Sequence, residues 1–482
     1  MNFSIAEILA ALTPVVHIVG AIAVTIDAVL RKRQVPAVIG WVGLAWLAPI
    51  VGSMFYLAFG INRIKRSASA LKLAAAWELS SVPAALRSEA LRSEDFAARH
   101  PAFAGLSFLG QRLTGNTLLS GNAIEPLIDG NQAYPAMLEA IERAETSLTL
   151  VSYIFDNDRA GERFLEALIN AQQRGVQVRV LIDDFGSRYT RPSMLKRLRK
   201  AGIREAAFLP TRVPRMFPYA NLRNHRKIMV ADGRTGFTGG MNIREGHWID
   251  HDPRHPIHCL HFRVDGPAVA DLQRTFAVDW AFTTGEYLEG ETWFPNLDRA
   301  GSVAARGIPD GPDADIDNIL HLLLGALSVA TRRVRIVTPY FLPDEVLLRA
   351  LHVAAMRGVE VDIVLPAKSN IPLLHWATAP QLTELISHGC RVHFTGPHFD
   401  HTKLMVVDSF WSLIGSTNWD ARSLRLNFEY NLECYDEPLA QRLDRLIMQK
   451  IAAAHRVTPE ELARPMPIRL RNGIARLFSP YL

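Results

Sequence analysis

A short motif of ionisable residues occurs twice in the chain with the same internal spacing. Each copy has a histidine, a lysine two positions later and an aspartate five positions after the lysine: His225, Lys227 and Asp232 in "NHRKIMVADG", and His401, Lys403 and Asp408 in "DHTKLMVVDS". A lone histidine is usually structural, but two copies with identical spacing are improbable by accident. The duplication therefore predicts that these residues carry a function.

The residue types suit a reaction at a phosphodiester, whose negative charge resists a nucleophile. The two lysines can neutralise the phosphoryl oxygens, so neither a metal ion nor another cofactor is expected. One neutral imidazole can attack phosphorus and form a phosphohistidine, while the other, protonated, donates to the departing oxygen. The roles reverse when a second alcohol or water arrives, so two histidines are the minimum set. Asp232 and Asp408 complete the predicted catalytic set, although an aspartate after a strand can as readily fix a turn.

A turn of small residues follows each motif at the same distance. Its sequence is "GGMN" at 239–242 and "GSTN" at 415–418. Small residues let the backbone and the asparagine side chain approach a ligand closely. We expect the asparagines to bind the phosphate together with the lysines, and the second residue of each turn to support the site: Asn242 and Asn418, with Gly240 and Ser416.

The apolar residues between lysine and aspartate predict a strand in each motif, which puts the histidine and the lysine on the same face. A longer repeat precedes each strand, because residues 140–183 parallel residues 326–366. Both segments contain a helix, a strand that ends in an aromatic pair, a second helix that closes at Arg-Gly and a Val-rich strand. This alternation predicts an α/β fold with a largely buried sheet, duplicated within the chain.

Two long apolar runs open the sequence. Residues 8–30 contain Asp27 as their single acid, and residues 34–62 contain no Asp, Glu, Lys or Arg. Each run exceeds the roughly 20 residues that cross a bilayer core. A signal peptide would begin with a basic region, but no residue before Arg31 is basic. We therefore expect a transmembrane hairpin of two helices over 1–62, with Asp27 paired to Arg31 near the interface.

The chain divides into five expected segments: the hairpin at 1–62, a membrane-proximal helical linker at 63–115, a first α/β half at 116–300, a second at 301–455 and a basic amphipathic tail at 456–482. The tail sequence "PIRLRNGIARLFSPYL" mixes arginines with Ile, Leu and Phe. Its spacing suits a helix at a membrane interface, and equally a helix packed on the protein's own surface.

Composition adds weaker constraints. A chain of 482 residues with 49% apolar content can bury a large core, and its net charge of +5 suits anionic surfaces of either lipid or nucleic acid. Three scattered cysteines are too few for a disulfide framework, which fits a reducing compartment. Since the basic residues that flank the two apolar runs are nearly balanced, the cysteines favour a cytoplasmic main body.

The duplicated motif with its following turn resembles the signature of the phospholipase D superfamily, and the resemblance covers residues 116–455. It implies that the two halves pack as a pseudo-dimer, so that both motifs meet in one active site. It also implies that His225 is the nucleophile and that His401 is the general acid and base.

In that family an acidic residue on a later strand orients each histidine. Glu429, in "NFEYNLE", is expected to orient His401. The corresponding strand of the first half, "HCLHFRVDGPAV", has Cys259 where the second acid is expected. The acids that remain for His225 are then one from the other half, Asp250 or Asp252.

Further stretches, among them "SYIFDND", "TPYFLPD", "NWDARSLRLNFE" and the terminal "RLFSPYL", resemble bacterial cardiolipin synthases. This resemblance implies transfer of a phosphatidyl group from one phosphatidylglycerol to another at the bacterial inner membrane, with release of glycerol. Phospholipids and the membrane are the expected partners. A hydrolytic phospholipase D would use the same residues with water as acceptor. A phosphodiester nuclease would need a basic track and gains nothing from a membrane hairpin, so no nucleic acid is expected.

Overall fold

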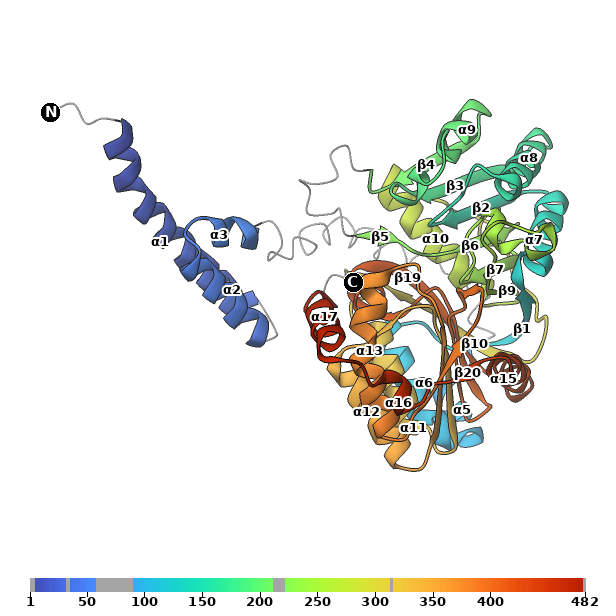
Figure 1. The fold of residues 1–482 in the computed structure, drawn as a ribbon. Helices are drawn as coiled ribbons and strands as arrows, with labels where there is room; N and C mark the ends of the chain where they lie inside the picture. Colours follow the sequence, from blue (N-terminus) through green and yellow to red (C-terminus); the bar gives the residue numbers. More distant parts are fainter. Residues whose placement is uncertain (1–4, 32–34, 58–89, 211–221, 313–314, 480–482) are drawn as a thin grey trace. The chain divides into compact units, whose positions relative to one another are not determined.

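The computed structural model describes residues 5–31, 35–57, 90–210, 222–312 and 315–479 (Figure 1). The described chain forms two compact units. The N-terminal helices belong to the smaller unit, and the two motif-bearing halves form the larger one.

The first apolar run forms one helix, α1 (Ile5–Arg31). Its stretch Leu12–Arg31 is long and apolar enough to cross a bilayer. The expected ion pair near its end is confirmed, because Asp27 Oδ1 lies 3.0 Å from Arg31 Nε. The other carboxylate oxygen of Asp27 accepts a hydrogen bond from the Tyr56 hydroxyl at 2.7 Å.

The second apolar run differs from the expected single span. It is divided into α2 (Val35–Leu47) and α3 (Val51–Phe55), which pack with α1 (Figure 1). The break follows from Pro49, which has no N–H to donate inside a helix, and the next residue, Ile50, has a φ of 60°. A helix of 13 residues is about 20 Å long, short of the roughly 30 Å bilayer core. The described hairpin therefore has one arm long enough to span, not two.

The segment expected as a helical linker near the membrane, 63–115, is described only in its second part. Its part before residue 90 lies outside the described residues. The remainder forms α5 (Ser93–Arg99) and α6 (Pro101–Thr114), and Phe103 and Leu106 of α6 are buried in the core of the second half. Burial of these apolar side chains makes α6 part of the larger unit.

The first half alternates strands and helices as the repeat predicted. Its elements are β1 (Leu119–Ile128), α7 (Asp129–Arg143), β2 (Ser147–Ser152), α8 (Arg159–Gln173), β3 (Gln177–Asp183), α9 (Met194–Lys200), β4 (Arg204–Phe208), β6 (Ile228–Ala231), β7 (Thr235–Gly239), β9 (Leu260–Asp265) and α10 (Val269–Thr284). Asp158 starts α8, because its side chain accepts a hydrogen bond from Gly161 N at 3.0 Å.

The second half repeats this order. Its elements are β10 (Val303–Asp310), α11 (Asn318–Val329), β11 (Arg333–Val337), α12 (Glu345–Met356), β13 (Glu360–Pro366), α13 (Pro372–Ser387), β14 (Arg391–Thr395), β16 (Leu404–Val407), β17 (Trp411–Gly415), β19 (Asn427–Tyr435) and α15 (Glu437–Ala452). Asp344 caps α12 as Asp158 caps α8, by accepting a hydrogen bond from Leu347 N at 3.1 Å.

The strand order shows the duplication directly. From β14 the sheet runs β14-β13-β11-β16-β17-β19-β10, and it continues as β1-β9-β7-β6-β2-β3-β4, the same order in reverse. The two halves meet where β1 and β10 pair antiparallel, with Leu119 opposite Ala305. In the second half, α11, α12 and α13 lie on one side of the sheet and α15 on the other (Figure 1). The predicted duplicated α/β fold is thus confirmed, with a separate buried core in each half.

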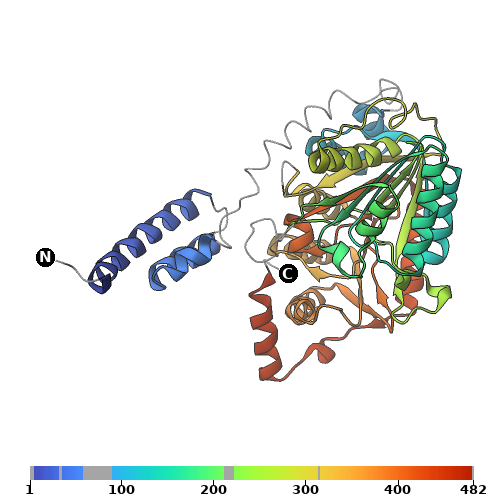
Figure 2. The ribbon, with the colours of Figure 1, turned by 90° about the horizontal axis from the view of Figure 1, so that it is seen from above.

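The chain ends in two helices on the second half, α16 (Pro459–Leu462) and α17 (Met466–Arg476). Helix α17 packs against α13 and lies at the surface of the larger unit (Figure 2).

Candidate active site

The histidines of the two motifs lie in one site, with their ring centroids 6.4 Å apart. His225 follows β5 (Arg223–Asn224), which pairs in parallel with β19 of the other half, and its N–H donates to Phe428 O at 2.9 Å. His401 follows β15 (Phe399–Asp400), which pairs with β8 (Ile257–His258), and its N–H donates to His258 O at 2.7 Å. Each histidine is therefore held in place by a strand of the opposite half.

Glu429 lies beside His225, whereas the sequence had assigned it to His401. The Nδ1 atom of His225 is 2.9 Å from Glu429 Oε1. The reason is the pairing of β5 with β19, which carries the second-half carboxylate across to the first-half histidine. Of the three sources considered for His225, the acid from the other half is the one present. Asp250 and Asp252 are exposed.

Three further groups fix the position of Glu429, two at its carboxylate and one at its backbone. Ser416 donates its hydroxyl to Oε2, and Asn427 donates its side-chain amide to Oε1 at 3.1 Å. Arg226 holds the backbone of the same residue, because its Nε donates to Glu429 O at 3.0 Å. Burial alone would raise the pKa of Glu429, but His225, Lys227 and Ser416 lower it below the ordinary value. The carboxylate is therefore charged.

Cys259 occupies the position in the first half that Glu429 occupies in the second. Gly239 pairs with His261 in one half and Gly415 with Asn431 in the other, so the residues two positions earlier correspond. Burial raises the pKa of the Cys259 thiol to about 12, so this position supplies no charge. The two halves therefore differ at one chemically decisive position.

A backbone carbonyl takes the place of the carboxylate for His401. The Nδ1 atom of His401 is 2.8 Å from Gly240 O. Close packing requires a glycine there, because a Cβ atom at residue 240 would lie 2.6 Å from His401 O and 2.8 Å from Cys259 Sγ. Gly240 and Ser416, the predicted supporting residues, thus each contact a histidine or its partner, and each does so by different chemistry.

The charges of the site favour neutral imidazoles between two buried lysines. Burial lowers the pKa of His225 to about 4 against the opposing effect of Glu429, and burial with the nearby lysines lowers the pKa of His401 well below its ordinary value. Burial also lowers the pKa of Lys227 to about 7 and that of Lys403 to about 8. Each lysine donates to the backbone oxygen of its own motif histidine.

The motif aspartates lie away from this centre, at the far ends of strands β6 and β16. Each aspartate is five positions beyond its lysine, with four strand residues between them, a span of about 16 Å. Asp232 accepts backbone hydrogen bonds from residues 145–147, and Asp408 accepts them from residues 331–333. Both have a φ near +50°, at 52° and 51°. These contacts fix the turns that precede β2 and β11, so the structure gives the two aspartates a structural position and not the catalytic one predicted.

The two asparagines border the site differently. Asn242 Oδ1 accepts a hydrogen bond from Ile154 N at 3.1 Å, which leaves its Nδ2 to donate elsewhere. Asn418 Nδ2 donates to Ser423 Oγ at 3.0 Å. The Oδ1 atom of Asn418 is buried without a hydrogen-bond partner among the described residues. Rotation of that amide by a half turn would keep a bond to the Ser423 hydroxyl and present a donor instead.

Four ring side chains that the sequence did not single out also lie beside the histidines. The Tyr153 ring is 5.3 Å from that of His225. The rings of Phe399, His247 and Tyr340 are 6.0, 6.2 and 6.3 Å from that of His401. Tyr153 and Tyr340 follow the matching strands β2 and β11, within the aromatic pairs of the repeat, so the sequence held a signal for them. His247 lies in a short helical turn (Glu245–His247), and no pattern of the sequence indicated it. Within the described residues, no group of three or more His, Cys, Asp or Glu is placed to hold a metal ion.

Comparison with known proteins assigns this arrangement to a family. The family model described as "Cardiolipin synthase, PLD-like domain" matches residues 137–280 and 323–451. The "Major cardiolipin synthase ClsA" of Bacillus subtilis (strain 168) is 32% identical to this chain over 501 residues, covering 99% of this chain and 100% of that protein. "Cardiolipin synthase 2" of Staphylococcus epidermidis is 31% identical and covers 94% of each chain.

A solved structure shares the fold. The phosphatidylserine synthase of Haemophilus influenzae Rd KW20 superposes with a TM-score of 0.62, covering 78% of this chain and 100% of that chain. The sequence identity is 15%, so this likeness concerns the fold alone.

Proposed function

This chain belongs to the cardiolipin synthase family of phospholipase D-like proteins, and from that membership we propose that it transfers a phosphatidyl group between two phosphatidylglycerol molecules and releases glycerol. The observation that carries the proposal is the pair of histidines, one from each half, whose rings lie 6.4 Å apart with two buried lysines nearby. Such a site offers a nucleophile, an acid and two cations, which are the groups that transfer of one phosphoryl group requires.

In the first step, His225 attacks phosphorus. Its Nδ1–H donates to Glu429, so Nε2 carries the lone pair that forms the N–P bond. The bond from phosphorus to the oxygen of the headgroup glycerol breaks, and His401 Nε2–H gives its proton to that oxygen. The ammonium groups of Lys227 and Lys403 balance the charge on the phosphoryl oxygens.

In the second step, a headgroup hydroxyl of another phosphatidylglycerol attacks the phosphohistidine. His401 takes the proton of that hydroxyl, and the N–P bond to His225 breaks. The products are cardiolipin and the original enzyme, in which His401 is protonated again by the proton of the attacking hydroxyl. Water in place of the second lipid would give phosphatidic acid.

The different partners of the two histidines support these roles. A phosphorylated His225 carries positive charge, which the Glu429 carboxylate stabilises. Protonated His401 has a neutral carbonyl partner and two lysines nearby, so it is the stronger acid of the two. Entry of the anionic phosphodiester offsets the repulsion by the lysines, and we therefore expect His401 to become protonated as substrate binds.

The first experiment is product analysis with the full-length protein in detergent micelles that contain phosphatidylglycerol as the sole phospholipid. We expect cardiolipin and glycerol to appear together in equal amounts. A protein with His225→Ala is the matched control and should release neither. Phosphatidic acid without cardiolipin would overturn the transfer reaction while leaving the two-histidine chemistry intact.

We further propose a location in the bacterial inner membrane with the larger unit on the cytoplasmic side. Helix α1 supports the membrane anchor, since Leu12–Arg31 is long and apolar enough to span. The cytoplasmic side is supported by the three cysteines, which are all free and buried.

A further inference from the structure

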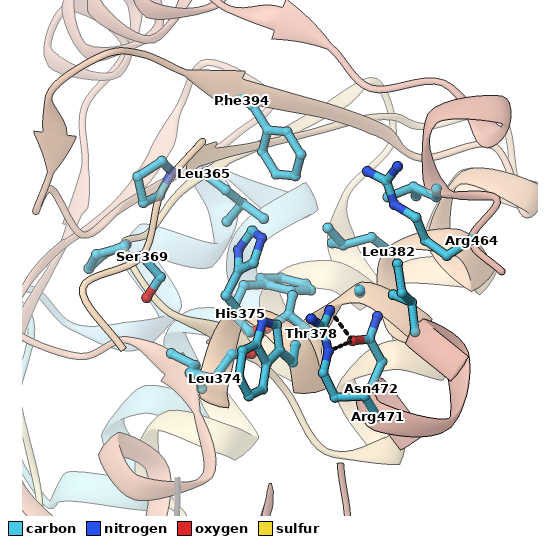
Figure 3. A pocket seen from close by; sticks show the side chains of 17 residues that line it. Leu365, Ser369, Leu374, His375, Thr378, Leu382, Phe394, Arg464, Arg471 and Asn472 are labelled. Atoms are coloured by element: carbon cyan, nitrogen blue, oxygen red, sulfur yellow. Dashed lines mark hydrogen bonds between the residues drawn. The ribbon is translucent and has the colours of Figure 1, made fainter. Parts of the chain in front are cut away.

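The last helix, α17, has an inner face that is already occupied by protein. Asn472 and Ala475 are buried, and Ala475 packs with Leu374 and Ala377 of α13. The same face helps to enclose a cavity of about 230 Å³ between α13 and α17, where Figure 3 shows His375 and Thr378 opposite Arg471 and Asn472. These contacts fix the rotation of α17 about its own axis.

The outer face of α17 is apolar and exposed. Its large side chains recur at spacings of four and three residues, which places them on one side of the helix and just beyond its end: Met466, Leu470, Ile474, Leu477 and Phe478, exposed by 69, 63, 50, 76 and 50%. We call these five residues the outer face. A contiguous apolar surface of this kind on a folded protein marks a contact with another phase or molecule.

The charges along this segment indicate what the outer face contacts. Four arginines lie along the same segment, Arg464, Arg469, Arg471 and Arg476, and residues 462–479 contain no acid. Arg471 stacks over the Trp376 ring with its guanidinium carbon 4.4 Å from the centroid, an arrangement that keeps a cation beside an apolar surface. An amphipathic helix with only positive charge matches the interface of an anionic bilayer.

The position of α17 relates this surface to the active site. The segment 339–341, which follows β11, borders both the cavity below α17 and the active site, because Pro339 and Phe341 line the cavity while the Tyr340 ring lies beside that of His401. Helix α17 therefore lines a cavity whose wall includes a segment that borders the active site.

We propose that the outer face of α17 is a membrane-contact surface, which lies in the headgroup region of an anionic bilayer and orients the larger unit independently of α1. The contact does not depend on which phospholipid reaction the site catalyses. A second copy of the chain is the alternative occupant, and the experiment distinguishes the two.

The experiment uses full-length protein reconstituted into vesicles of phosphatidylcholine and phosphatidylserine. Because the three native cysteines are buried, a cysteine introduced by Leu470→Cys or Ile474→Cys can be labelled selectively with an environment-sensitive fluorophore. Met448→Cys is the matched control, since Met448 is an exposed apolar residue on α15, on the other side of the sheet (Figure 1). Nitroxide-bearing lipids then report contact by quenching.

We expect quenching at residues 470 and 474 to exceed that at residue 448 several-fold, and to fall when phosphatidylcholine replaces phosphatidylserine. Equal quenching at all three positions would overturn the proposal. Weak quenching at 470 together with energy transfer between differently labelled copies would also overturn it, in favour of a dimer. Loss of transferase activity changes none of these readouts, so failure of the proposed function and failure of this contact remain distinguishable.

Discussion

At the scale of single residues, the two histidines are made unequal by one position of the repeat. Glu429 gives His225 a charged partner, while the equivalent Cys259 gives His401 none, and Gly240 O accepts its hydrogen bond instead. In the proposed mechanism, a charged partner favours His225, which would carry the phosphoryl group. A neutral partner favours His401, which would give up a proton.

This asymmetry predicts opposite sensitivities at the two equivalent positions. Glu429→Gln preserves size but removes the charge, so kcat for glycerol release should fall about 100-fold or more. Cys259→Ser should change kcat by a few fold at most, because the thiol is neutral. Initial rates with phosphatidylglycerol micelles measure both, and circular dichroism confirms that each variant is folded. An equal decrease of kcat in the two variants would show that His225 does not depend on a charged partner.

The lysines predict how substrate binding changes with pH. They bind phosphate only as ammonium ions, and their pKa values of about 7 and about 8 mean that the charge is lost as pH rises through this range. KM for phosphatidylglycerol should therefore increase above about pH 7, approaching tenfold per unit for each lysine that titrates. Bound phosphodiester keeps the lysines charged, so kcat should change less.

Lys227→Arg is the control for this prediction, because a guanidinium stays charged throughout the range. In this variant, KM should no longer show the increase with pH that begins near the pKa of Lys227, about 7. A wild-type KM that is constant from neutral to alkaline pH would contradict the assignment of the lysines to phosphate binding.

At the scale of elements, the residues at the two ends of strands β6 and β16 have different roles. The histidine and lysine of each motif precede the strand and enter the site, while the aspartate follows it and closes a turn with the start of β2 or β11. Each motif therefore has one end in the site, proposed to be catalytic, and one end that fixes a turn, joined by four strand residues.

Removal of the structural end should affect stability and not chemistry. Asp408→Asn loses the charged acceptor of the backbone N–H groups of residues 331–333, so the free energy of unfolding should decrease by about 2 kcal/mol. The kcat of the folded protein should remain close to that of the wild type. Chemical denaturation and initial rates provide the two measurements, and Asp232→Asn should behave alike. A large loss of kcat with unchanged stability would restore a catalytic role.

At the scale of the whole molecule, the site exists because two halves of one chain meet along β1 and β10. His225 depends on β19 of the second half, and His401 depends on β8 of the first. Neither half contains a complete set of groups, which explains why the motif occurs twice in one chain.

An intramolecular site predicts that two inactive variants cannot rescue one another. His225→Ala and His401→Ala should each abolish turnover on phosphatidylglycerol without preventing membrane insertion. Mixed in one micelle population, they should remain inactive, because each chain still lacks one histidine of its own site. Activity that grows on mixing would mean that the site is shared between two chains.

Some of this organisation follows from the sequence alone. Residue spacing and periodicity, which are local along the chain, predict the two motifs, the faces of their strands and the duplicated α/β order. The length of the first apolar run likewise predicts that α1 can span a bilayer. The length of the second apolar run, however, also predicted a second span, where Pro49 and Ile50 divide the helix.

Only the tertiary structure decided which groups meet. Glu429 reaches His225 because β5 pairs with β19, and Asp232 and Asp408 bind turns because β6 and β16 lie beside β2 and β11. Such pairings join segments as far apart as 204 residues, the separation of His225 and Glu429. They depend on the register and burial of the whole sheet, which no local pattern of residues records.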